Sequence, residues 1–221
     1  MKTSSVILFV VLSIILSSCR NTPVTETSGV ITRDSFDRVN EPPPPPPGRL
    51  TKGKYLTQDS LMKYLVEAKA EIRKPGKGKP FNSLHYNKVI AYEFEGREER
   101  NSHIFNSQGR FAPVITKQRA LEQAKVDWLT NLLSKKSTYG GVTAACFVPH
   151  TALAFYRDTI PVMDISICLG CNYLESSIKI PAESENTFLI DTASYPAYGF
   201  SDDAKKELRK FCDNLGYVYA K

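Results

Sequence analysis

Apolar residues recur at helical spacing in three stretches of the chain, and each stretch has polar residues on its opposite face. The first begins after Thr57 and ends before Pro75. The second covers about 116–133 and carries the only tryptophan, Trp128, which we expect in the core. The third covers 201–216, with two aspartates in its first turn and a glycine at its end. These patterns predict three helices.

Other stretches have the composition of β-strands. Residues 88–94 are rich in β-branched and aromatic side chains. Residues 151–156 and 161–169 lie on either side of a short polar connection, which is typical of a β-hairpin. We therefore predict a single α+β domain over residues 54–221, with an antiparallel sheet built around this central hairpin and covered by about three helices.

The register of the hairpin follows from its apolar side chains. Residues directly opposite each other in an antiparallel pair share a face of the sheet. Placing large apolar residues opposite one another pairs Phe155 with Met163 and Leu153 with Ile165. The hairpin is thus predicted to present one strongly apolar face to the core.

The amino terminus has the pattern of an export signal. A positive charge at Lys2 precedes an apolar run at 6–16, which is too short to span a membrane, and small residues then lead to Cys19. This pattern resembles the lipobox of bacterial lipoproteins. The resemblance implies removal of a signal peptide, residues 1–18, and acylation of Cys19 with diacylglycerol and a further acyl chain such as palmitate. Two or more acyl chains would anchor the protein stably to a lipid bilayer.

The segment that follows is poor in apolar residues and contains six consecutive prolines at 42–47. Such a sequence favours an extended polyproline II conformation over a folded core. We therefore interpret residues 19–53 as a lipidated, proline-rich tether that holds the domain away from the membrane.

The formal net charge is +6, and the basic residues are spread along the chain. This distribution and the predicted export argue against a nucleic-acid partner. The bilayer itself and another protein of the cell envelope are the partners we expect. Arg20 follows the acylated cysteine in place of the aspartate that retains some lipoproteins at the inner membrane, so resemblance to sorted lipoproteins favours the outer membrane.

The open end of the hairpin gathers the chemically reactive residues. Continued outward, the register places His150 opposite Cys168 and puts Cys146 within one residue of Cys171. The sequence therefore predicts that three sulfurs and one imidazole meet at this end of the sheet.

Four kinds of site are compatible with these residues. A disulfide among the three cysteines suits an exported protein, and a Cys3His metal site, most simply for zinc, suits the ligand types and the short spacings. A redox-active Cys-x-x-Cys with His150 lowering a thiol pKa is the third. The fourth is a cysteine nucleophile with His150 as its base, for which Asp164 is the one nearby orienting group. No catalytic residue is assigned among these alternatives.

Cys212 lies on the apolar stripe of the last predicted helix, where a free, buried cysteine is expected. Its alternative role is as an additional thiol, either a fourth sulfur at the hairpin or a partner of Cys146. His85 and His103 have polar neighbours and no second ligand at metal spacing, so we expect both on the surface.

The residues from Ala145 to Asn172 resemble a group of small bacterial proteins, often lipoproteins, that carry a Cys-x-x-Pro element, a nearby histidine and a returning Cys-x-x-Cys strand. The resemblance implies a fold and no particular reaction. We therefore expect a membrane-anchored cell-envelope lipoprotein with an interaction or structural role, whose hairpin is fixed by a disulfide or zinc. The alternative is an envelope thiol-redox enzyme or metalloenzyme that uses the same cysteines and histidine.

Overall fold

The computed structural model describes residues 55–95, 103–112 and 114–219. The predicted signal peptide, the lipidation site Cys19 and the predicted tether lie outside these residues. In the described part of the chain, no helix is long and apolar enough to cross a membrane.

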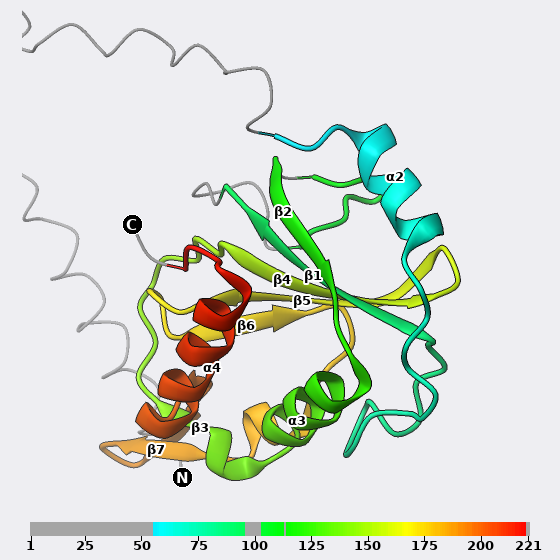
Figure 1. Cartoon of the computed structure of the whole chain (residues 1–221). Coiled ribbons are helices and arrows are strands. Elements are labelled where there is room, and N and C mark those ends of the chain that lie inside the picture. The colour runs from blue at the N-terminus through cyan, green and yellow to red at the C-terminus, as the bar shows by residue number, and fades with distance from the viewer. Residues whose placement is uncertain (1–54, 96–102, 113, 220–221) are drawn as a thin grey trace, which may run out of the picture. The chain divides into compact units, whose positions relative to one another are not determined.

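A five-stranded antiparallel sheet forms the centre of the described domain (Figure 1), with strand order β2-β1-β4-β5-β6. Three α-helices of the described chain lie against it, so the predicted α+β class is confirmed. The strands of this sheet are β1 (Lys88–Phe94), β2 (Ile115–Ala120), β4 (Thr151–Arg157), β5 (Ile160–Cys168) and β6 (Tyr173–Ser176).

The central hairpin β4–β5 has the predicted register. Phe155 pairs with Met163, and Leu153 pairs with Ile165. Strand β1 also has its predicted bounds and pairs with the other edge of β4. The hairpin is therefore an interior part of the sheet, and its open end lies where β5 turns into β6.

Both faces of the central strands are buried. Every residue of β1 is buried, and so is every residue of β4 except the last, Arg157. One face, with Leu153 and Phe155, contacts helices α3 (Gln123–Leu133) and α4 (Asp202–Leu215). The opposite face contacts helix α2 (Gln58–Glu67). This sandwiching explains why these strands are apolar or small at nearly every position.

Helix α2 begins as predicted but ends earlier. The Thr57 side chain accepts a hydrogen bond from the backbone N–H of Ser60 and so caps the helix. The prediction that the helix continues to Ile72 is wrong, because Leu61 and Leu65 pack on one face of the sheet while Ile72 packs in the core on the other. The chain must leave the helix to cross the edge of the sheet.

The second predicted helix is also shorter than expected. Residues 116–120 belong to β2, which pairs with the free edge of β1, and α3 begins only at Gln123. Tertiary pairing with β1 overrides the apparent helical spacing here. Trp128 is half-buried on α3 and stacks on Phe211 of α4, with ring centroids 5.6 Å apart.

Helix α4 matches its prediction. Ser201 is the N-cap, and Gly216 ends the helix with φ of 67°, a left-handed conformation that glycine adopts without strain. Cys212 lies on its buried stripe, as predicted, and the full stripe is Ala204, Leu208, Phe211, Cys212 and Leu215.

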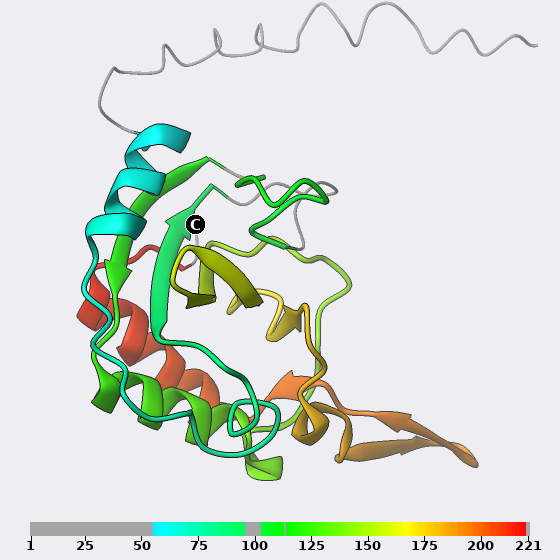
Figure 2. The ribbon, with the colours of Figure 1, turned by 90° about the vertical axis from the view of Figure 1, so that its right-hand side faces the viewer.

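Several short elements complete the described chain. The strands β3 (Tyr139–Gly141) and β9 (Gly199–Phe200) pair as a small sheet beside the open end of the hairpin. The strands β7 (Thr187–Ile190) and β8 (Ala193–Pro196) form a hairpin that projects from the body (Figure 2). Two short 3-10 turns complete the order: η1 (Lys136–Thr138) and η2 (Pro181–Ser184).

The close approach of β3 and β9 predicts a strict need for glycine at Gly141. A Cβ at this position would collide with the backbone oxygen of Phe200. We expect Gly141→Ala to lower the free energy of unfolding by about 1–3 kcal/mol, as for other overpacked sites. Gly170, where a Cβ would meet no atom within 4 Å, provides the control, and Gly170→Ala is expected to change stability by less than about 0.5 kcal/mol. Equal denaturation midpoints for the two variants would contradict this account.

Candidate functional site

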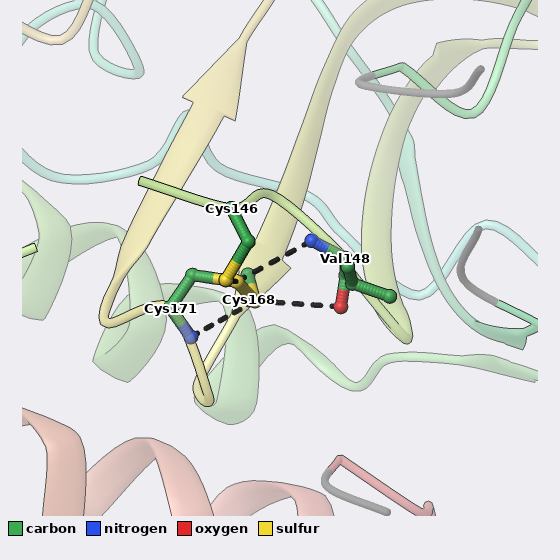
Figure 3. Close-up of a disulfide and its surroundings, with 4 residues drawn as sticks. All are labelled: Cys146, Val148, Cys168 and Cys171. Atoms are coloured by element: carbon green, nitrogen blue, oxygen red, sulfur yellow. Dashed lines mark hydrogen bonds between the residues drawn. A yellow bond between two sulfur atoms is a disulfide. The ribbon is translucent and has the colours of Figure 1, made fainter. Parts of the chain in front are cut away.

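The β5–β6 turn and the segment that leads into β4 meet at the open end of the hairpin (Figure 3). Cys168, the last residue of β5, forms a disulfide with Cys171 in the turn, and their Cα atoms are 5.2 Å apart. Both residues are almost fully buried, at 3% and 2% exposure. The Cys-x-x-Cys pair is thus bonded to itself and shielded from solvent.

Cys146 belongs to the same sulfur cluster but is chemically different. It is exposed and has no disulfide partner. Its Sγ lies 3.4 Å from Sγ of Cys171, and Figure 3 shows its side chain pointing towards the two bonded sulfurs. A free thiol at the surface therefore contacts one specific sulfur of a buried disulfide.

The backbone of Val148 contacts both bonded sulfurs. Its N–H donates to Sγ of Cys171 at 3.3 Å, and its carbonyl oxygen lies 3.3 Å from Sγ of Cys168. In addition, the N–H of Cys171 donates to Sγ of Cys168 at 3.0 Å. Main-chain N–H donors stabilise negative charge on sulfur, so either sulfur has a donor in place if it leaves as a thiolate.

The turn residue Asn172 holds the parts of the site together. It adopts φ of 66°, a conformation that asparagine tolerates better than most residues. Its Nδ2 donates to the carbonyl oxygens of Val142 at 2.9 Å and Phe200 at 3.0 Å. The N–H of Ala144 donates to the oxygen of Cys171 at 2.9 Å. These bonds fix the exposed segment that carries Cys146 against the turn.

His150 is placed one residue before β4, and its Nδ1 lies 3.4 Å from the carbonyl oxygen of Phe94. It lines a cavity of about 340 Å³ together with Glu93, Lys117 and Val218. His150 therefore lies beside the end of β1 and lines this cavity.

Glu93 is the charged group buried in this cavity. Burial by itself would raise its pKa, but its carboxylate accepts hydrogen bonds from Thr116 at 2.5 Å, the N–H of Val218 at 2.7 Å and Lys117 at 3.1 Å. These bonds outweigh the desolvation and hold the pKa of Glu93 below its usual value. The carboxylate is thus used to fasten the carboxyl-terminal segment to β1 and β2.

Asp164, which sequence reasoning offered as an orienting group for His150, contacts a different histidine. Its Oδ2 lies 3.2 Å from Nδ1 of His103, and it pairs with Ala154, four residues along β4 from His150. That separation corresponds to roughly 13 Å along a strand. His103 is therefore part of an interaction with a buried carboxylate, while His85 is exposed as expected.

Cys212 is buried in helix α4 and is not disulfide-bonded. Its Sγ lies 3.7 Å from Oγ1 of Thr151. Burial is the main cause that raises the pKa of this thiol to about 11, which leaves it protonated and unreactive at neutral pH.

A zinc site would use the same cysteines as the disulfide. Among the described residues, no group of three or more histidine, cysteine, aspartate or glutamate side chains is arranged to hold a metal ion. In the disulfide form, Cys168 and Cys171 are bonded to each other. A zinc site would require both as separate thiolates.

Sequence reasoning missed the contacts that Val148 and Asn172 make around the sulfur cluster. Val148 and Asn172 support the sulfur cluster through main-chain and amide groups, which no spacing rule for cysteines and histidines would identify. The chain matches no protein-family model, no curated protein and no solved structure. The chemistry of the cluster is therefore the basis for its interpretation.

The hydrogen bonds of Glu93 predict a pH-dependent contribution to stability. A carboxylate with a lowered pKa stabilises the fold above its unfolded-state pKa, near 4.5, and that stabilisation is lost as the pH falls through the lower folded-state value. We expect Glu93→Gln to lower the denaturation midpoint at pH 7, and the difference from wild type to narrow as the pH drops below about 4.5.

Glu207→Gln is the matched control, because Glu207 pairs with Lys210 on the exposed face of α4. Exposed pairs of this kind contribute about 0–1 kcal/mol. A Glu93→Gln effect no larger than that of the control, or one that persists unchanged at low pH, would contradict the role given to Glu93.

Proposed function

We propose that the protein is a lipid-anchored component of the bacterial cell envelope that exchanges disulfides with cysteines of other proteins. The observation that carries this proposal is the 3.4 Å separation between the exposed Cys146 Sγ and Sγ of Cys171 in the buried disulfide. Reacting atoms about 3–3.5 Å apart are within the range of a near-attack geometry.

The reaction would transfer two electrons. Thiol–disulfide exchange proceeds by attack of a thiolate on a disulfide sulfur through a mixed disulfide. With a partner that has two free cysteines, the partner's thiols become a disulfide, and Cys168 and Cys171 become two thiols. The two electrons and two protons lost by the partner are gained by the bonded pair, so the exchange balances without a further cofactor.

A purely structural disulfide is the competing proposal, with the protein serving an interaction role in the envelope. The bond between Cys168 and Cys171 closes a loop with a sequence separation of only three residues. In the chain-entropy account, so short a loop contributes about 2 kcal/mol, whereas bridges across longer loops contribute more. The short loop and the neighbouring free thiol favour exchange over reinforcement.

The cellular location rests on the amino-terminal sequence. The short apolar run and the small residues before Cys19 support export and acylation at that cysteine. The residue that follows, Arg20, favours the outer membrane. The protein would then bind the bilayer through its acyl chains. Its cysteine site would react with exported proteins that have accessible cysteines.

The exchange proposal predicts a specific dependence on Cys146. The lipidated chain, extracted in detergent without reductant, is expected to oxidise a reporter peptide that contains two cysteines, with the peptide losing two hydrogens by mass spectrometry after an acid quench. Cys146→Ser is expected to slow this reaction by a factor of about ten or more, because the two bonded sulfurs are buried.

Cys212→Ala is the control for this experiment, because that thiol is buried and not disulfide-bonded. It should oxidise the peptide at the wild-type rate. Peptide oxidation that is equally fast in the Cys146→Ser protein, or absent in wild type with the disulfide intact, would exclude the proposed function.

Anchoring is tested separately. We expect the wild-type chain, expressed with its leader in a bacterial host, to fractionate with membranes and to carry acyl chains on Cys19 by mass spectrometry of the amino-terminal peptide. Cys19→Ala is expected to leave the protein unacylated and to shift it out of the detergent-soluble membrane fraction. A wild-type amino-terminal peptide without acyl chains would indicate an ordinary signal peptide and would contradict the anchor.

A further inference from the structure

We infer that Cys171 is a sulfur shared by two partners, and that the disulfide migrates between Cys168 and Cys146. This inference deepens the proposed function and rests on it for its biological use, although the migration itself needs no outside partner. It assigns a different role to each of the three cysteines.

The geometry makes Cys171 the central sulfur. Its Sγ is bonded to Cys168 and lies 3.4 Å from the free Sγ of Cys146. The N–H of Val148, two residues after Cys146, donates to Sγ of Cys171. The same backbone segment therefore presents the attacking thiol and holds the sulfur that it would attack.

Because the bonded sulfurs are buried, the disulfide must migrate before a thiol of another protein can attack it. Cys168 and Cys171 are 3% and 2% exposed, whereas Cys146 is exposed. A thiol on another protein can reach Cys146 but is excluded from the bonded pair. The buried Cys168–Cys171 disulfide can therefore oxidise another protein only through Cys146.

The step is an exchange without net oxidation. The Cys146 thiolate attacks Sγ of Cys171, forming the Cys146–Cys171 bond and breaking the Cys168–Cys171 bond. The electron pair of the broken bond leaves on Sγ of Cys168, and the proton released by Cys146 returns to Cys168 through solvent. One disulfide and one thiol are present before and after the step.

The freed Cys168 would find partners already in place. The N–H of Cys171 lies 3.0 Å from its Sγ and would stabilise the leaving thiolate. Once protonated, the Cys168 thiol could donate to the carbonyl oxygen of Val148, which lies 3.3 Å away. Both forms of the cluster are thus supported by backbone groups that are present in the structure.

The two forms differ in what they offer to other proteins. With Cys168–Cys171 bonded, the exposed group is a thiol, and with Cys146–Cys171 bonded, it is a disulfide that a cysteine of another polypeptide can attack at Cys146. Attack at Cys146 releases the Cys171 thiolate, and a second cysteine of the same polypeptide then displaces Cys146. The substrate class is therefore a polypeptide with two accessible cysteines that can pair with each other.

Tryptic mapping distinguishes the two forms. Cleavage after Lys136, Arg157 and Lys179 places Cys146 in the peptide 137–157, and both Cys168 and Cys171 in the peptide 158–179. A Cys168–Cys171 bond lies within one peptide, whereas a Cys146–Cys171 bond joins the two. We expect the full wild-type chain, equilibrated at pH 8 without reductant and acid-quenched before digestion, to yield both products.

Two matched variants test which sulfur is shared, since each removes one partner of the original disulfide. After oxidation with glutathione disulfide, Cys168→Ser is expected to give the cross-linked peptides with Cys146 protected from alkylation. Cys171→Ser is expected to give at least about tenfold less cross-link, with Cys146 open to alkylation or glutathionylation. Cross-linking that is equally complete in both variants would overturn the assignment of Cys171.

The wild-type measurement keeps the inference testable even where a variant folds poorly. Absence of the cross-linked peptide from wild type at pH 8 overturns the migration. If peptide oxidation nevertheless depends on Cys146, the proposed function stands without the migration. If the cross-link forms but the reporter peptide is not oxidised, the migration is supported and the proposed function is contradicted.

Discussion

The burial of both faces of the central strands is the constraint on which the rest of the structure depends. Because side chains alternate between faces, a slip of one residue in β4 would move Leu153 and Phe155 from the α3–α4 side to the α2 side. The register is therefore fixed by packing on two sides. This fixed register determines where β5 ends. Cys168 therefore lies at the open end of the hairpin, next to the segment that carries Cys146.

The sequence was most informative where packing and local preference agree. The β4–β5 register, β1 and helix α4 were predicted because their apolar patterns and end residues indicate the same structure that the core requires. The helices α2 and α3 were predicted too long. In both cases the chain passes the edge of the sheet. After α2, the packing of Ile72 on the opposite face ends the helix, and before α3, the pairing of β2 with β1 delays its start. Such long-range contacts leave no mark on local periodicity.

The candidate site shows the same division. Spacing along the hairpin was sufficient to anticipate that the sulfurs of Cys146, Cys168 and Cys171 lie near one another, since strand pairing converts sequence positions into distances. Spacing did not indicate that His150 lies beside the end of β1, in the lining of a cavity formed by β1, β2 and Val218. The supporting bonds of Val148 and Asn172 depend on backbone orientation in irregular segments, which residue types alone do not specify.

The position of Cys212 has a consequence for how the chain acquires its disulfide. In the folded protein this thiol is enclosed between α4 and Thr151, and its raised pKa keeps it protonated. In an unfolded chain it is an ordinary thiol that competes with the other three for oxidation, and sequence alone does not select among the pairings. Docking of α4 onto the sheet removes this competitor. Docking of α4 before oxidation would therefore keep Cys212 out of any disulfide and leave the pairing to Cys146, Cys168 and Cys171.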